Sequence, residues 1–204
     1  MDKEVKSLND FEYVSQVTGW CLHNVKNTSM EEDDKFFFPP KIFHEKIGNC
    51  IDIAFLIHLW CEEHNVANRI CQVCFEYRNM GKTIVNSNGH VVCVCREPLN
   101  HGMWTVEQTS GIKDRVNDPF FVYEPSLEKA IEKFAKAYLP FLVGKIREIR
   151  PGIEVTGYYY TILGRKQVDA IERRYHSGIV NNKQKFFHQL MEECDKAELK
   201  DIPK

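Results

Sequence analysis

The sequence contains no run of about 18 apolar residues, the shortest length expected of a membrane-spanning helix. Its first residues, Met1 to Lys6, lack the apolar stretch of a secretory signal. It also lacks an excess of charge of one sign, since the formal net charge is −2 and basic and acidic residues are distributed along the chain. Internal repeats and low-complexity tracts are absent as well. We therefore expect a cytoplasmic protein that binds neither membranes nor nucleic acids.

The length and composition indicate one globular domain. The chain has 204 residues, of which 43% are hydrophobic and 27% are charged, and this balance allows a sizeable buried core. We expect a single domain over residues 1–204, with its core over residues 8–125 and a helical extension over residues 126–204.

Hydrophobic periodicity predicts an α+β fold. Apolar residues at helical spacing predict helices over residues 8–26 (with a possible interruption near Gly19), 50–64, 126–149, 166–175 and 182–197. Short β-rich runs predict strands over residues 70–77, 82–85, 90–96, 104–109 and 153–163. The acidic and proline-containing segment 27–40 reads as a loop. Together these patterns favour a mostly antiparallel sheet packed against helices.

Cys50 differs from the other seven cysteines in its local setting, because it follows Gly48 and Asn49 at the start of a predicted helix. Asn49 is a good residue to cap that helix. A helix amino terminus presents unpaired N–H groups and the positive end of the helix dipole, both of which favour a thiolate. We therefore expect Cys50 to ionise more readily than a free thiol.

His90 and Glu107 are candidate partners for this thiol. Asn88-Gly89 is a turn pattern, so His90 is predicted to open a strand and could act as the base that accepts the thiol proton. Glu107, on the next predicted strand, could accept the other imidazole N–H and orient the ring.

These residues carry a resemblance to the transglutaminase-like superfamily. The shared positions are Gly48, Cys50, Asp52 and Ala54 at the helix start, His90 after Gly89, Trp104 with Glu107 and Thr109, and upstream Trp20, His23, Asn24 and Val25. The similarity covers roughly residues 11–110. It implies a papain-like core with Cys50 as nucleophile, His90 as base and Glu107 as the orienting acid.

Two positions depart from the family pattern. Val92 stands where an aromatic residue is common, and Glu107-Gln108-Thr109 replaces Asp-Pro-Thr. Asp118, which precedes Pro119, is therefore an alternative third member of the triad. The Cys50 backbone N–H is expected to stabilise the oxyanion, with Trp20 or Asn49 as candidate second donors.

Two groups of residues and one acidic run are candidate metal sites. Cys71-x-x-Cys74 and Cys93-x-Cys95 could form a zinc site, but both pairs lie in strand-like runs that are typical of a core. His58, Cys61 and His64 share a broad helical face and could bind a metal, but partial burial or surface exposure is the more ordinary explanation of these residues. The acidic run 31–34 lacks the glycine and the ligand spacing of a calcium loop. We expect neither a metal nor another cofactor.

The sequence therefore favours a cysteine-dependent acyl-transfer enzyme that hydrolyses a peptide or amide bond of a protein or peptide substrate through a thioester. Transamidation to an amine and a non-catalytic binding module of the same fold are the alternatives. The pattern does not indicate an oligomeric state.

Overall fold

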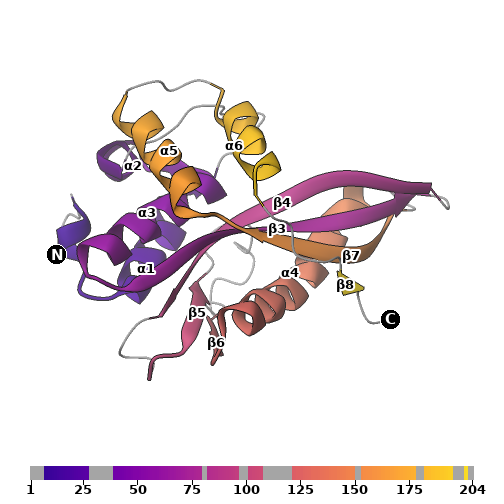
Figure 1. Cartoon of the computed structure of the whole chain (residues 1–204), viewed down its shortest axis with the longest axis horizontal. Coiled ribbons are helices and arrows are strands. Elements are labelled where there is room, and N and C mark those ends of the chain that lie inside the picture. The colour runs from indigo at the N-terminus through magenta and orange to yellow at the C-terminus, as the bar shows by residue number, and fades with distance from the viewer. Residues whose placement is uncertain are drawn as a thin grey trace.

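The described chain has an α+β fold built on a six-stranded antiparallel sheet with the strand order β6-β5-β4-β3-β7-β8 (Figure 1). The structure, a computed structural model, describes residues 7–27, 39–79, 82–96, 101–107, 121–149, 153–177, 182–194 and 200–201. The strands are β3 (Ala67–Asn79), β4 (Lys82–Arg96), β5 (Trp104–Glu107), β6 (Phe121–Glu124), β7 (Ile153–Ile162) and β8 (Lys200–Asp201), with a separate parallel pair of β1 (Lys26–Asn27) and β2 (Ile47–Gly48). The predicted α+β class and antiparallel sheet are confirmed.

Helices cover both faces of this sheet. They are α1 (Val14–Asn24), α2 (Pro39–Glu45), α3 (Cys50–Glu63), α4 (Leu127–Ile149), α5 (Arg165–His176) and α6 (Lys183–Glu192), preceded by a 3-10 helix, Leu8–Asp10. Helix α4 packs on one face, and the other helices pack on the opposite face (Figure 1). Successive residues of β4 therefore enter different cores: Val92 and Val94 pack on the α4 side, whereas Val91 and Cys93 pack on the α3 side.

Helix α3 is the central helix of the larger core. Every residue from Ile51 to His58 is buried, as expected for a helix surrounded by other elements. Further along the helix, the indole N–H of Trp60 donates to the carbonyl oxygen of Phe11 at 3.2 Å. Because α3 is packed on all sides, its amino end is held in a fixed position relative to β4.

The structure corrects the predicted turn before His90. Residues 82–96 form one strand, β4, which pairs along β3, and Gly89 lies opposite Cys74 inside this ladder. A Cβ at Gly89 would come within 2.5 Å of the Gln72 side-chain nitrogen, so a larger residue there would require the glutamine side chain to shift. Asn88-Gly89 is therefore not a turn, and His90 lies in the interior of a strand.

The other elements follow the sequence closely. The helices predicted over residues 126–149 and 166–175 and the strand predicted over residues 153–163 are confirmed as α4, α5 and β7. The first helix begins only at Val14 and is not interrupted at Gly19. The last predicted helix ends at Glu192. Since β7 pairs along β3, the C-terminal part of the chain adds a strand to the central sheet as well as helices.

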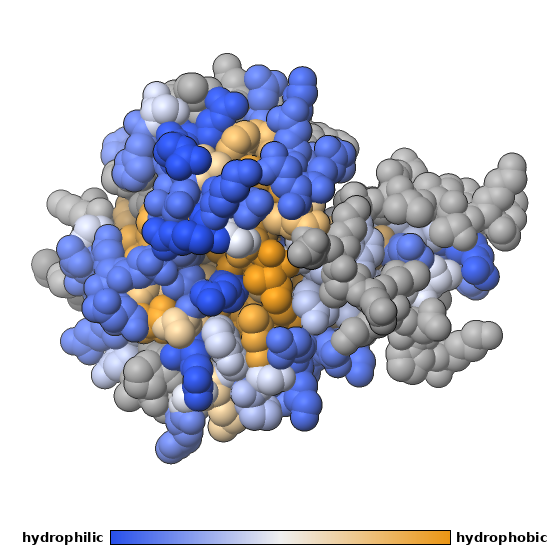
Figure 2. All heavy atoms as spheres, in the orientation of Figure 1, coloured by the Kyte–Doolittle hydropathy of each residue, from blue (hydrophilic) through white to orange (hydrophobic). Residues whose placement is uncertain are grey.

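The face viewed in Figure 2 is mostly hydrophilic, with apolar side chains visible near its centre, between helices α5 and α6 and the lower helix α4. No helix in the described ranges is both long enough and apolar enough to cross a membrane.

Candidate active site

Cys50 is the first residue of α3, and hydrogen bonds fix the turn that carries it. The Asn49 side-chain oxygen accepts the backbone N–H groups of Ile51 at 3.0 Å and Asp52 at 3.5 Å. In return, Asp52 Oδ2 accepts the Asn49 N–H at 3.0 Å, which completes a capping box. The predicted helix start and the capping role of Asn49 are confirmed.

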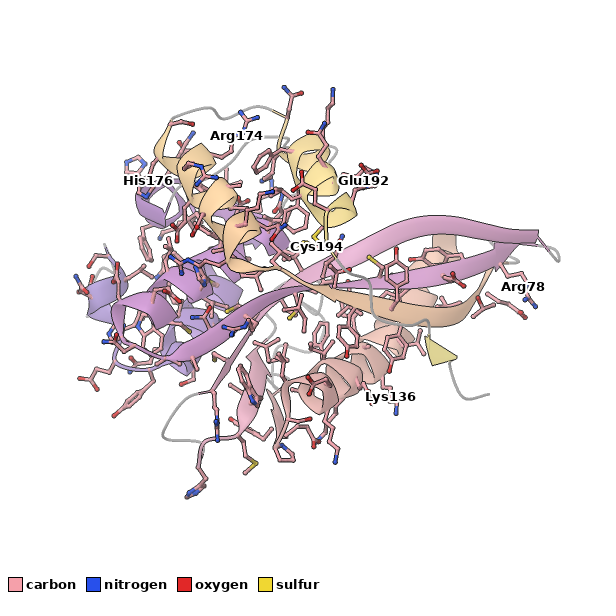
Figure 3. The ribbon with its side chains drawn as sticks, viewed as in Figure 1. Arg78, Lys136, Arg174, His176, Glu192 and Cys194 are labelled. Atoms are coloured by element: carbon pink, nitrogen blue, oxygen red, sulfur yellow. The ribbon has the colours of Figure 1, made fainter. Side chains whose placement is uncertain are left out.

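Exposure separates Cys50 from most of the other cysteines. None of the eight is in a disulfide, six are buried, and only Cys50 and Cys194 are partly exposed. Cys194 lies just beyond the end of α6, where its thiol donates to the carbonyl oxygen of Leu190 at 3.3 Å (Figure 3). Cys50 is therefore the one partly exposed cysteine that lies at a helix amino terminus.

The thiols weighed as zinc ligands do not converge. Cys71 packs in the core on the α4 side, whereas Cys93 and Cys95 pack in the core on the α3 side. No group of three or more His, Cys, Asp or Glu side chains in the described part of the chain is placed to hold a metal ion. The acidic run 31–34 lies outside the described residues.

His90 is buried on the α4 side of β4, in an aromatic environment. Its ring stacks on Tyr138 at a centroid distance of 4.8 Å and on Phe134 at 5.9 Å. Burial lowers the pKa of His90 from 6.5 to about 4, because the surrounding protein disfavours the charged imidazolium. In this arrangement His90 is neutral at physiological pH.

The sulfur of Cys50 lies against the same segment of β4. Burial raises the pKa of Cys50, and a hydrogen bond to the sulfur from the backbone N–H of Val91, the residue after His90, partly offsets this increase. Burial raises the pKa of Tyr138, which stacks on His90, and the charge of an ionised Cys50 raises it further. Cys50 packs with the core on the α3 side and meets the backbone of β4 there, whereas the His90 ring lies on the α4 side of the same strand.

The pKa of Cys50 differs from the expectation based on its helix position. Burial is the largest influence and raises the pKa, and the Asp52 carboxylate raises it further. The N–H groups of Val91 and Ile51 and the cation of Lys183 act in the opposite direction. The helix start does favour the thiolate, but burial outweighs it, so the expectation of a readily ionised thiol was wrong for this conformation.

Neither candidate for the orienting acid has a side chain within the described part of the structure. Glu107 is the last residue of β5, where its backbone pairs with Phe121, and its side chain lies outside the described residues. The described pairing of β5 with β4 involves Val94 and Cys95 and does not reach His90. Asp118 also lies outside the described residues.

The two candidate oxyanion donors occupy different environments. Trp20 packs in an aromatic cluster, 4.9 Å from the Phe43 ring and 6.3 Å from the Phe11 ring. The side-chain oxygen of Asn49 is used in capping, and its nitrogen is buried with no hydrogen-bond partner among the described groups. Asn49 directly precedes Cys50 in the chain.

Asp52 connects the Cys50 turn to the C-terminal helices. Its Oδ1 accepts the hydroxyl of Tyr175 from α5 at 2.8 Å, and its Oδ2 accepts the ammonium of Lys183 from α6 at 2.8 Å. Both charged side chains have no exposed surface. No local pattern predicts these partners, because lysine is rarely buried and the two contacts span more than 120 residues.

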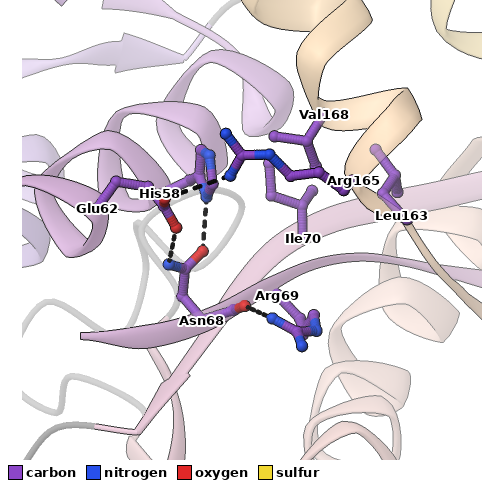
Figure 4. A pocket seen from close by; sticks show the side chains of 9 residues that line it. His58, Glu62, Asn68, Arg69, Ile70, Leu163, Arg165 and Val168 are labelled. Carbon is purple, nitrogen blue, oxygen red and sulfur yellow. Dashed lines mark hydrogen bonds and ion pairs between the residues drawn. The ribbon is translucent and has the colours of Figure 1, made fainter. Parts of the chain in front are cut away.

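A cavity of about 350 Å³ lies at the other end of α3, between β3 and the start of α5 (Figure 4). His58 contributes its Nδ1, which lies 2.6 Å from the Asn68 side-chain oxygen, and the Asn68 amide donates to Glu62 at 2.9 Å. His64 instead stacks on Trp60, at a centroid distance of 4.2 Å. His58 and His64, two of the candidate metal ligands on this helical face, are thus engaged in other contacts.

No known protein family, curated protein or solved structure matches the chain. The geometry around Cys50 is therefore the main indication of function.

Proposed function

We propose that this protein is a cysteine-dependent acyl-transfer enzyme with a papain-like, transglutaminase-like core. One observation carries the proposal: the partly exposed Cys50 begins a capped helix, and its sulfur contacts the β4 segment that carries His90. A nucleophile at a helix start and a histidine on an adjacent strand are the two groups that this chemistry needs.

In the proposed reaction, Cys50 attacks the carbonyl carbon of an amide while its thiol proton passes to His90. The carbonyl oxygen becomes an oxyanion next to the Cys50 backbone N–H. The carbon–nitrogen bond then breaks as the imidazolium returns the proton to the leaving amine, which produces a thioester. Glu107 would hold the imidazole in the required orientation.

Water completes the cycle when His90 removes its proton and the resulting hydroxide attacks the thioester, which releases a carboxylic acid and restores the thiol. An amine in place of water would produce a new amide. We favour hydrolysis of a protein or peptide substrate, because water needs no dedicated binding site.

The Cys50 thiol and the His90 imidazole are both neutral before the substrate binds, and this determines when the proton moves. Since burial raises the pKa of Cys50 and lowers that of His90, proton transfer is expected to accompany attack on the substrate rather than precede it. The raised pKa of Cys50 and the lowered pKa of His90 also favour a second candidate function, a non-catalytic binding module of this fold. An acylation experiment distinguishes the enzyme from the binding module.

The test is acylation by p-nitrophenyl acetate, followed by release of p-nitrophenolate. Wild-type protein should show a burst equal to one thioester per chain, and Cys50→Ala should show none. His90→Ala should slow the burst by about 100-fold, the lower range for loss of a general base. An equal burst in all three proteins would contradict the enzymatic proposal and favour the non-catalytic module.

A further inference from the structure

Lys183, the first residue of α6, is a fully buried cation that the proposed reaction leaves without a role. Its ammonium lies 2.8 Å from Asp52 Oδ2, and neither side chain has exposed surface. Removing two charges from water is costly, so a buried ion pair is weak evidence of a role in stability alone. Its position next to a nucleophile suggests a different use.

Asp52 is the residue through which Lys183 reaches Cys50. It lies two residues after Cys50 in the first turn of α3 and accepts the Asn49 N–H at 3.0 Å, which closes the capping box. Its other oxygen accepts the Tyr175 hydroxyl at 2.8 Å. One carboxylate thus joins the cap of α3 to both C-terminal helices.

The capping carboxylate has an electrostatic disadvantage at this position. A negative charge beside Cys50 disfavours the thiolate, and Asp52 indeed raises the pKa of Cys50. Lys183 acts in the opposite direction and lowers that pKa. The lysine therefore allows the helix to keep its cap while part of the unfavourable charge is offset.

We infer that Lys183 is a positioning residue of the Cys50 site: it offsets the charge of Asp52 beside the thiol and, with Tyr175, anchors the first turn of α3 to helices α5 and α6. This inference extends the proposed function, because it assumes that Cys50 is the nucleophile. It also makes the C-terminal helices part of the active site.

The experiment measures the rate of Cys50 alkylation by iodoacetamide from about pH 6 to pH 9, with each cysteine quantified by peptide mass spectrometry. Lys183→Met should slow Cys50 labelling at neutral pH by about threefold to tenfold, because the thiolate fraction falls tenfold for each unit of pKa. Asp52→Asn should shift the profile to lower pH and speed the labelling. Lys185→Met, which removes an exposed lysine of the same helix, is the matched control and should leave the profile unchanged.

Opposite shifts distinguish positioning from a merely structural role, since loss of structure would move both variants in one direction and would also expose the six buried cysteines. Shifts in the same direction, or no shift, would overturn the inference. If Lys183→Met does not fold, the double variant Asp52→Asn with Lys183→Met is compared with Asp52→Asn alone, and a Cys50 midpoint that loss of the lysine does not raise overturns the inference. Alkylation needs neither substrate nor His90, so this result is independent of the acylation test of the proposed function.

Discussion

The two ends of helix α3 both carry charged networks, but the networks differ in their exposure to water. At the amino end, Asp52 and Lys183 form an ion pair in which neither side chain has exposed surface. At the carboxyl end, Glu62 and Arg165 form a pair at 3.3 Å in which the side chains are 44% and 65% exposed. The same type of interaction is therefore found in two very different environments.

This difference indicates which network the fold depends on. Water screens the exposed pair and solvates either partner when the other is lost, so such pairs contribute little to stability. A buried charge that loses its partner has no such compensation. Substitutions at the amino end of α3 should therefore have large effects, and those at the carboxyl end small effects.

The largest expected effect is that of Lys183→Met on stability. The substitution leaves Asp52 buried without its cation, which should lower the free energy of unfolding by about 3–5 kcal/mol. Chemical denaturation monitored by circular dichroism measures this change. The double variant Asp52→Asn with Lys183→Met removes both charges and should recover much of the loss, whereas a double variant no more stable than Lys183→Met would contradict the electrostatic explanation.

The second largest effect is the pH dependence of the free energy of unfolding, which His90 should cause. The pKa of His90 is lowered from 6.5 to about 4, so the unfolded chain binds a proton at this site that the folded chain does not. Stability should therefore be complete above about pH 6.5 and fall by about 3 kcal/mol as the pH decreases to about 4.

His90→Phe should remove this dependence, because phenylalanine can keep the ring stack on Tyr138 without titrating. Unfolding free energies measured at several pH values provide the comparison, and His23→Gln, at an exposed position of α1, is the control. Parallel pH profiles for wild type and His90→Phe would show that His90 is not buried as described.

The smallest effect is expected at the carboxyl end of α3. Arg165→Met removes an exposed guanidinium that pairs with Glu62 and Asp169. Because water replaces these contacts, the midpoint of thermal unfolding should not change measurably. A loss comparable to that of Lys183→Met would remove the contrast between the two ends of the helix.

Local patterns were sufficient to predict the amino end of α3. Gly48 and Asn49 followed by an apolar run predicted the helix start at Cys50, and the capping hydrogen bonds follow from the asparagine side chain. The α+β class and several helix and strand boundaries also follow from hydrophobic periodicity.

Local sequence patterns do not predict contacts between residues that are far apart in the chain. The side chain of Lys183 reaches Asp52 across 131 residues, and no local pattern distinguishes a buried lysine from an exposed one. The pairing of β3 with β4 overrode the turn preference of Asn88-Gly89, because the ladder continues through both residues. Burial, which is a property of the whole fold, also set the direction of the pKa change at Cys50.

The most direct test of the central claim compares two cysteines within one molecule. After a short exposure to p-nitrophenyl acetate, peptide mapping gives the ratio of acetylation at Cys50 to that at Cys194, the other partly exposed thiol. If Cys50 is the nucleophile of an acyl-transfer site, the acetyl group should be found almost entirely on Cys50, and the ratio should fall towards one in His90→Ala. Equal acetylation of the two cysteines in the wild-type protein would contradict the account.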